Sequence, residues 1–342
     1  MQVRPTEMSM SVRCEGCGLE YAGGRGLRGI FAQPRRLIDL RFARMLWQVR
    51  RFHRRALAFL RTTDEQNLTT YGEFLERQGF SGYFIAHYAV PVVSCVWSAG
   101  RETALAYPAR YLFRFLDHHG MLRVGGSPQW YSIAGGSRVY VERLTGLLID
   151  VRAAHAVTDV TRRGDGVQIR DVTGRITGVD RVVIATHADQ ALGLLADPSD
   201  EEVTTLKQFG YSSNVTVLHT DRSVLPEARN ARASWNYRMT SCHRPGQPAV
   251  VSYWMNRLQG HRSPQDFLVT LNDREVLDPE YIVATMEYEH PIYTPDAVRA
   301  QSQLGGLATG RTVYAGAYHG WGFHEDGCRS GVEAARHFGV TW

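Results

Sequence analysis

The segment of residues 313–336 combines glycine, aromatic and acidic residues in an order that favours binding of an anionic cofactor. An apolar run ends at Gly316, and glycine at such a point lets the backbone approach a ligand closely because it has no side chain. The Asp326-Gly327 step then begins a predicted helix, whose first N–H groups form an anion site. Such a site suits a phosphate or the electron-rich edge of a reduced flavin. The candidate contacts in this segment are Gly316, Gly320, Gly322, Phe323, Glu325, Asp326 and Gly327.

Two histidines of the same segment are candidate catalytic residues. His319 and His324 flank the glycines, and imidazole can carry protons because it titrates near neutral pH. The alternative is that both are hydrogen-bonded loop residues, which is the commoner role of histidine. The pattern favours the second interpretation, so both stay weak candidates.

Cys14 and Cys17 have the spacing of half a zinc site. Neither a second C-x-x-C motif nor a nearby pair of histidines completes four ligands, so we predict a tight hairpin turn and no metal. All five cysteines are expected to be reduced thiols, because an odd number scattered through a long chain is not typical of a disulfide framework.

Alternating strands and helices must position the candidate cofactor contacts. The Gly135-Gly136 turn precedes a predicted helix at 137–148, and the run 181–186 resembles a buried parallel strand that feeds a helix at 188–195. The remaining predicted elements are a hairpin at 8–22, a helix at 34–61, strands at 156–160 and 167–172, longer strands at 214–219, 233–237, 249–255 and 267–271, a strand at 312–315 and a helix at 327–337.

The segment 313–336 resembles the carboxyl-terminal flavin-binding motif of amine-oxidase and phytoene-desaturase flavoproteins. The whole chain is similar to oxidoreductases related to the flavoprotein domain fused to plant cyclopropane fatty acid synthases. The segments that carry this resemblance are 5–12 (PTEMSMSV), 29–33 (GIFAQ), 134–137 (AGGS), 185–191 (ATHADQA), 217–221 (VLHTD), 234–237 (SWNY), 253–259 (YWMNRLQ) and 288–291 (YEHP).

The resemblance implies FAD as the cofactor and assigns contacts by matching position. Val157 matches the strand residue whose backbone meets the adenine, and Ala185 and Thr186 match the strand end beside the cofactor. Gly316 matches the glycine near the ribityl phosphate, although Ala317 follows it where most relatives have an acidic residue. Gly135-Gly136 matches a further glycine contact, but these glycines alone mark a turn equally well.

The complete βαβ unit of a dinucleotide site, in which a G-x-G-x-x-G turn joins a parallel strand to a helix and an acidic residue follows roughly 20 residues later, is not found in this sequence. The first residues from Met1 resemble a position well inside the sequences of the family, after their first βαβ unit. We expect a misassigned start codon, a gene fragment or a degenerate protein that no longer binds flavin. Loss of a central strand would also leave the run 182–185 with an unpaired edge.

The predicted fold class is therefore α/β, with α+β character in the substrate domain. An amino-terminally truncated, Rossmann-like FAD-binding domain is expected to be built from residues 1–27, 129–186 and 301–342. It is interleaved with a substrate domain of antiparallel sheet plus helices, residues 28–128 and 187–300.

The positive charge of the chain is carried by arginine, because Lys207 is the only lysine. That count argues against pyridoxal and Schiff-base chemistry, which require a lysine amine. Within 35–61, one helix face carries nine arginines and a single acid, Asp39. This arginine-rich face is predicted either to be solvated or to bind an acidic partner or a membrane surface. We predict no nucleic-acid partner and a cytoplasmic location, and the oligomeric state stays open.

Two functions remain for the chain. The first is an FAD-dependent oxidoreductase acting on a lipid or acyl-chain substrate, inactive or impaired as encoded because the nucleotide-binding unit is absent. The alternative is a degenerate, non-enzymatic binding protein that keeps the basic amphipathic helix.

Overall fold

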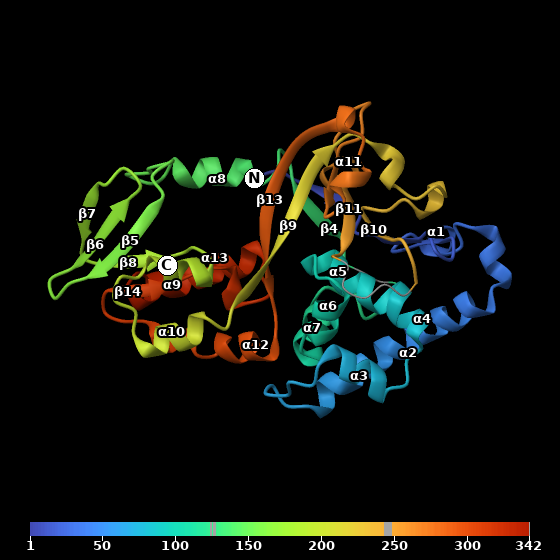
Figure 1. The fold of residues 1–342 in the computed structure, drawn as a ribbon, viewed down its shortest axis with the longest axis horizontal. Coiled ribbons are helices and arrows are strands. Elements are labelled where there is room, and N and C mark those ends of the chain that lie inside the picture. The colour runs from blue at the N-terminus through green and yellow to red at the C-terminus, as the bar shows by residue number, and fades with distance from the viewer. Residues whose placement is uncertain (124, 126–127, 243–247, 342) are drawn as a thin grey trace. The chain divides into compact units, whose positions relative to one another are not determined.

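The computed structural model describes residues 1–123, 125, 128–242 and 248–341. The chain divides into two compact units (Figure 1). The first comprises Met1–Gly146 and Ser212–His290, and the second comprises Leu147–Tyr211 and Pro291–Trp342.

A seven-stranded sheet forms the centre of the first unit, in the strand order β13-β9-β12-β11-β10-β2-β3. Its strands are β2 (Met10–Cys14), β3 (Leu19–Gly23), β9 (Gly210–His219), β10 (Trp235–Met239), β11 (Val250–Trp254), β12 (Leu268–Leu271) and β13 (Ile282–Ile292). Strands β2 and β3 form the predicted antiparallel hairpin, which is confirmed. Strand β10 pairs with β2 in parallel and with β11 antiparallel, so the two halves of the sheet meet there.

The described residues of the same unit also form helices. They are α1 (Gly26–Ile30), α2 (Leu40–Thr62), α3 (Tyr71–Arg77), α4 (Gly82–Phe84), α5 (Val90–Trp97), α6 (Arg101–Ala106), α7 (Ala109–His118), α8 (Arg138–Thr145) and α11 (Met255–Gln259), with short turns η1 (Pro34–Ile38), η2 (Ile85–Ala89), η3 (Arg222–Val224), η4 (Arg229–Ala231), η5 (Arg274–Val276) and η6 (Pro279–Tyr281). A separate antiparallel pair joins β1 (Val3–Thr6) to β4 (Trp130–Ile133).

Helix α2 confirms the predicted helix at 34–61, with its first residues in the turn η1. Asp39 caps it, because its carboxylate accepts hydrogen bonds from the backbone N–H groups of Arg41 and Phe42. Phe52 lies on the buried face and makes edge contacts with several aromatic rings, including Phe113 at a centroid distance of 5.5 Å. Most arginines lie on the opposite, exposed face.

The second unit contains two small sheets and four helices among its described residues. Its elements are the antiparallel strands β5 (Val157–Arg162), β6 (Val167–Asp171) and β7 (Ile176–Val179), the parallel strands β8 (Val182–Ile184) and β14 (Thr312–Tyr314), the helices α9 (Ala188–Leu194), α10 (Asp200–Leu206), α12 (Pro295–Gln301) and α13 (His324–His337), and the turns η7 (Leu304–Leu307) and η8 (Ala317–His319). The predicted parallel strand at 181–186 and the helix after it are confirmed, although only Ile184 of the strand is buried.

The compact units divide the chain differently from the predicted domains, whose boundaries stay a prediction. Residues 1–27 were predicted to belong to the cofactor domain, yet β2 and β3 extend the large sheet of the first unit. The pairing of β2 with β10 accounts for this, since it joins the first residues to the strands after 212. Among the described residues, no helix is long and apolar enough to cross a membrane.

Candidate functional site

The junction between β14 and α13 in the second unit is where most predicted cofactor contacts lie. Gly316 ends the strand, and a Cβ on it would lie 2.5 Å from Cε1 of the Tyr318 ring, so only glycine fits there. The hydroxyl of Ser330, on α13, accepts a hydrogen bond of 2.8 Å from the N–H of Gly316. This bond ties the turn after the strand to the helix.

Asp326 organises the loop between Gly320 and the start of α13. Its buried carboxylate accepts hydrogen bonds from the N–H groups of Trp321 and Phe323, at 3.0 and 3.1 Å. It also forms an ion pair with Arg329. A Cβ on Gly320 would lie 2.0 Å from Oδ1 of Asp326, which explains why glycine occupies this position. The hydrogen bonds to this carboxylate therefore hold the loop of the candidate site in place.

The first turn of α13 is the part of this junction suited to a negatively charged group. The first N–H groups of a helix have no intrahelical acceptor, and the helix dipole favours negative charge beside them. Gly327 lies in this turn, and a Cβ on it would have Ala317 N, 3.8 Å away, as its nearest neighbour. Glu325 and Phe323 are exposed here, and Gly322 has a φ of 91°, a conformation that favours glycine.

The structure brings the end of β8 next to Gly316. Strands β8 and β14 are parallel neighbours, and the carbonyl oxygen of Thr186 would lie 3.4 Å from a Cβ on Gly316. Ala185 and Thr186 are exposed. Val157 begins β5 in the same unit. Gly135 and Gly136 both have positive φ values, 88° and 78°, and precede α8 in the first unit.

The two candidate histidines differ in their surroundings. Burial and the nearby charge of Arg329 lower the pKa of His319 to about 4. Its Nε2 is buried and has no hydrogen-bond partner among the described residues. His319 is therefore neutral near pH 7. His324 is exposed on the first turn of α13. The catalytic roles of both histidines stay predictions.

The residues present fit the flavin side of an FAD site. Gly327 leaves room at a helix start, where an added Cβ would have Ala317 N at 3.8 Å as its nearest neighbour, and the buried Nε2 of His319 has no polar partner among the described residues. The nucleotide side is different, because the sheet of β8 and β14 has two strands among the described residues and Val183 on β8 is 43% exposed. Ala317 also leaves the position after Gly316 without a carboxylate.

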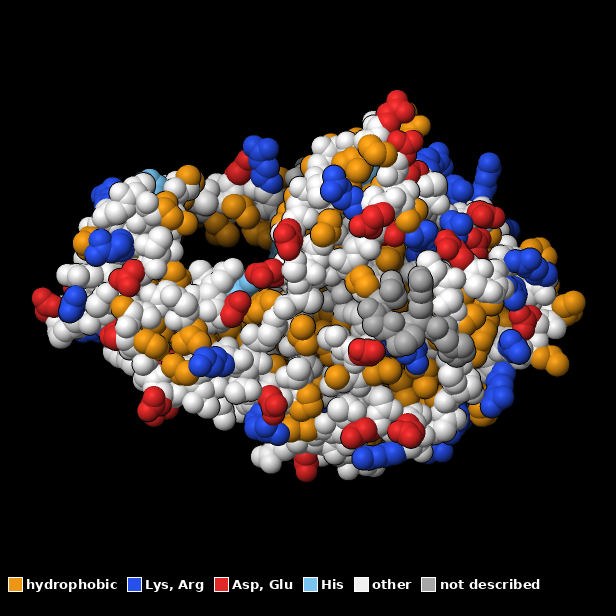
Figure 2. Space-filling view, in the orientation of Figure 1, with side chains coloured by type: hydrophobic (Ala, Val, Ile, Leu, Met, Phe, Trp, Pro, Cys, Tyr) orange, Lys and Arg blue, Asp and Glu red, His pale blue; other side chains and the backbone are white. Residues whose placement is uncertain are grey.

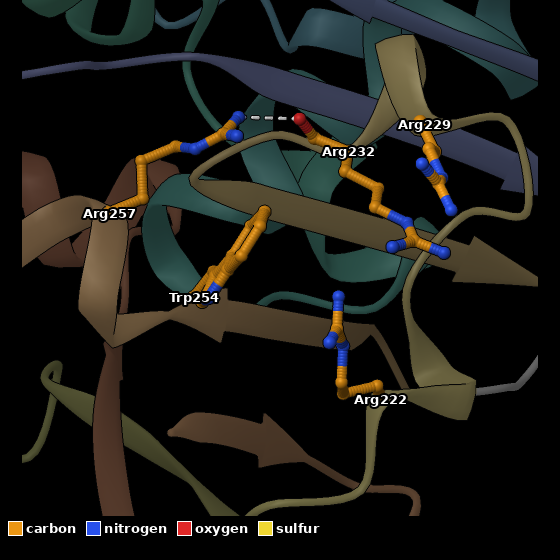
Figure 3. A pocket seen from close by; sticks show the side chains of 5 residues that line it. All are labelled: Arg222, Arg229, Arg232, Trp254 and Arg257. Carbon is orange, nitrogen blue, oxygen red and sulfur yellow. Dashed lines mark hydrogen bonds between the residues drawn. The ribbon is translucent and has the colours of Figure 1, made fainter. Parts of the chain in front are cut away.

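A second candidate site is a pocket of about 580 Å³ in the first unit, which sequence reasoning missed. Figure 3 shows the side chains that line it: Arg222, Arg229, Arg232, Trp254 and Arg257. The guanidinium of Arg257 lies over the Trp254 ring at 4.5 Å and donates to the carbonyl oxygen of Arg232. Burial lowers the pKa of Arg257, although nearby Glu7 opposes this. Four guanidinium groups around one pocket favour an anionic ligand such as a carboxylate or phosphate.

A neighbouring stretch of chain lines a mostly apolar pocket of about 450 Å³. Its lining residues are Leu218, Met255, Gln259, His261, Arg262, Ser263, Phe267 and Val269. Helix α11 contributes to both pockets, with Arg257 in the arginine pocket and Met255 and Gln259 in the apolar pocket. The only sequence signal for the arginine pocket is the local density of arginine at 222–232, and nothing in the sequence places Arg257 beside it.

Comparison with known proteins agrees with this geometry. Residues 17–266 match the family of flavin-containing amine oxidoreductases. Solved structures with the same fold include a conjugated-linoleic-acid (CLA)-producing fatty acid isomerase from P. acnes (16% identity, TM-score 0.65, covering 98% of this chain and 81% of that chain). They also include putrescine oxidase (11%, 0.64, 99% and 83%) and cyclohexylamine oxidase from Brevibacterium oxydans (12%, 0.62, 98% and 82%). No curated protein sequence matches the chain. The chain belongs to the flavin-containing amine oxidoreductase family, whose cofactor is FAD.

Proposed function

We propose that this chain forms most of an FAD-dependent oxidoreductase that acts on an acyl-chain substrate. The observation that carries the proposal is the start of α13, which follows a loop held by Asp326 and has room for a ligand beside Gly327, where an added Cβ would have Ala317 N at 3.8 Å as its nearest neighbour. FAD, when bound, supplies the hydride chemistry. The chain's own groups position it: the first N–H groups of α13 favour negative charge beside them, and His319 presents a neutral, buried imidazole.

Retention of FAD is proposed to require a βαβ unit with a G-x-G-x-x-G turn joined to this chain. Supporting this, apolar side chains of the second unit are exposed, among them Ile149, Val151 and Val183. Exposed apolar side chains on a short parallel strand are unusual, because parallel sheets are normally covered on both faces. A further strand and helix would bury them.

The absorption spectrum of the purified protein tests this function. The 342-residue chain is compared with the same chain carrying a G-x-G-x-x-G unit, taken from any in-frame upstream sequence or from a flavoprotein relative. We expect flavin bands and about one FAD per chain in the extended protein, and at least tenfold less in the shorter chain. Equal flavin in both would disprove the need for the added unit. Flavin in neither would remove the oxidoreductase proposal and leave a binding role.

The acyl-chain substrate is proposed from the two pockets of the first unit. Four arginines attract a carboxylate or phosphate and repel a diamine, and the apolar pocket lined by Leu218, Phe267 and Val269 suits a hydrocarbon chain. The similar P. acnes protein is a fatty acid isomerase. In the extended holoprotein, anaerobic addition of a fatty acid should bleach the flavin bands, whereas putrescine should not. The reverse result would overturn this substrate class.

A peripheral membrane surface is our second proposal, and it would bring the protein to an acyl-chain substrate. Leu37, Ile38 and Leu40 are 64%, 86% and 84% exposed beside exposed Arg41 and Arg44. Figure 2 shows hydrophobic and basic side chains next to one another at the right-hand edge, over η1 and the start of α2. Apolar residues that enter the interface and arginines that attract anionic headgroups are typical of membrane-surface helices.

Binding to phosphatidylserine-containing vesicles tests the membrane surface. Arg41→Glu with Arg44→Glu should weaken binding at least ~30-fold, since each basic residue near an anionic surface contributes about 1 kcal/mol and reversal adds repulsion. Arg170→Glu with Arg175→Glu, two exposed arginines of the second unit, makes the same change in net charge and serves as the control. Equal binding by the two variants would contradict the proposal, as would equal binding to neutral phosphatidylcholine vesicles.

A further inference from the structure

We propose that Cys14, Cys17, His87 and Cys242 bind one zinc ion in the first unit. One ligand atom from each of these side chains can be chosen so that all four lie within 4.8 Å of one another. Cys14 and His87 are buried, and Cys17 and Cys242 are half-buried. Three thiolates and one imidazole are a ligand set of structural zinc sites.

Two of the six distances between the ligand atoms have the length expected for a tetrahedral site. Zinc–sulfur bonds of ~2.3 Å and zinc–nitrogen bonds of ~2.05 Å place two sulfurs ~3.8 Å apart, and a sulfur and a nitrogen ~3.5 Å apart, around a tetrahedral ion. The Sγ atoms of Cys14 and Cys242 are 3.7 Å apart. The Sγ of Cys17 is 3.5 Å from Nε2 of His87. Both edges therefore have the length that a shared zinc ion requires.

The fold brings the cysteines together through the parallel pairing of β2 with β10. Cys14 ends β2 and lies opposite Met239, and the N–H of Glu15 donates to the carbonyl oxygen of Met239. The chain after β10 then runs beside the turn of the β2–β3 hairpin, where a Cβ on Gly16 would lie 2.9 Å from the Cα of Ser241. This close approach of two backbones places Cys242 at the C-x-x-C turn.

His87 presents the correct nitrogen to the site. It lies in η2, where the chain adopts a π-helical turn. Its Nδ1 is 2.9 Å from the carbonyl oxygen of Tyr83, so Nδ1 carries the hydrogen and donates it. The lone pair of Nε2 is then available on the side of Cys17. A backbone carbonyl bound to the second nitrogen is the usual support of a metal-binding histidine.

The C-x-x-C turn has the backbone arrangement that supports thiolates. The N–H of Cys17 donates to the sulfur of Cys14, and the N–H of Leu19 donates to the sulfur of Cys17. Gly18 has a φ of 62°, which favours glycine at this turn. The guanidinium of Arg36 donates to the carbonyl oxygen of Cys17 at 2.8 Å, which fixes the turn and brings positive charge near the thiolates.

The geometry favours one ion over a disulfide or an iron–sulfur cluster. A disulfide needs sulfurs ~2.05 Å apart, far closer than the 3.7 Å between Cys14 and Cys242. Four ligand atoms so close to one another leave no room for a cluster with its own sulfides. Four protein ligands also close the site, which is typical of a structural zinc ion. The ion would fix the hairpin, η2 and the chain after β10 to one another.

The sequence prediction of no metal is replaced by this proposal. It rested on the lack of a second motif near Cys14 and Cys17, and the spacing did indicate half a site. The other half comes from single residues at 87 and 242, which no local pattern connects to the hairpin. Parallel pairing of β2 with β10 supplies that connection.

Metal content of the full chain, purified under reducing conditions with zinc supplied, tests the proposal. We expect about one zinc per chain by elemental analysis, and Co²⁺ in its place should give the intense visible bands of a tetrahedral cobalt–thiolate site. Cys242→Ala should lower bound zinc at least tenfold. Cys242→His, which keeps a zinc ligand, should retain the ion, and Cys328→Ser, an exposed cysteine of the second unit, is the control.

Two results would overturn the zinc site. One is a folded chain with less than a tenth of an equivalent of metal and no cobalt bands after reconstitution. The other is zinc that remains equally bound in Cys242→Ala and in His87→Gln. Because the readout is metal content, it is independent of flavin binding.

Discussion

Replacing Glu202 by glutamine is expected to destabilise the second unit by about 2 kcal/mol, because it removes the negative charge that pairs with Arg162, while the ion pair of Arg162 with Asp197 remains. Both carboxylate oxygens of Glu202 accept hydrogen bonds from Arg162, at 2.6 and 2.9 Å. The hydroxyl of Tyr314, on β14, donates to the same carboxylate at 2.7 Å. The pair thus connects α10, β5 and the strand that leads to the candidate cofactor site.

The effect should depend on pH with a definite sign. Burial by itself would raise the pKa of Glu202, but hydrogen bonds from Arg162 and Tyr314 outweigh it and lower this pKa below its ordinary value. A carboxylate with a lowered folded pKa stabilises the protein above its unfolded pKa of about 4.3, and this contribution is lost as pH falls through the folded value. The difference between wild type and Glu202→Gln should therefore shrink below about pH 4.

Hydrogen exchange of peptides from each unit measures this local stability. Glutamine can keep one oxygen for the capping box with Ser199, but its NH₂ group then replaces the oxygen that accepts from Arg162 and Tyr314, so the substitution removes both of these interactions. Glu201→Gln, an exposed acid on the same helix, is the matched control and should change exchange little. If both variants exchange alike, or if protection is lost equally in the first unit, the assigned role of the pair is wrong.

Local patterns made much of the fold predictable. The β2–β3 hairpin, the helix α2 and the parallel strand β8 each depend on neighbouring residues: turn glycines, helical spacing of apolar positions and one continuous apolar run. Strand β13 was missed, and its alternation of half-buried and exposed residues includes charged positions such as Glu287 and Glu289. A strand of that composition gives a weak apolar signal.

Long-range pairing could not be predicted from the same patterns. The sequence placed the first residues in the cofactor domain, but β2 joins β10 across more than 200 residues, and no local signal encodes that partner. For the candidate site, glycine spacing indicated Gly316 and the start of α13. The hydrogen bonds that Asp326 accepts within its own loop could be found only in the structure. The arginine pocket and His87 also depend on contacts between distant segments.

Gly327→Ala is expected to weaken FAD binding by the extended protein about 100-fold, or ~2.7 kcal/mol, while leaving the helix at least as stable. An added methyl has room in the protein itself, since its nearest atom is 3.8 Å away, but it would occupy the space proposed for the cofactor. Alanine also stabilises a helix interior by roughly 1 kcal/mol relative to glycine. Loss of affinity without loss of stability would therefore come from the site itself.

Gly331→Ala provides the matched control on the same helix. Nothing lies within 4 Å of a Cβ at Gly331, so the two variants gain the same methyl and the same helix propensity. Flavin titration should show wild-type affinity for Gly331→Ala, and thermal unfolding should show equal or higher stability for both variants. If the extended protein binds FAD and Gly327→Ala and Gly331→Ala have equal flavin affinity, the cofactor lies away from α13. That result would leave the family assignment intact, because a tight site elsewhere in the chain would still supply the cofactor.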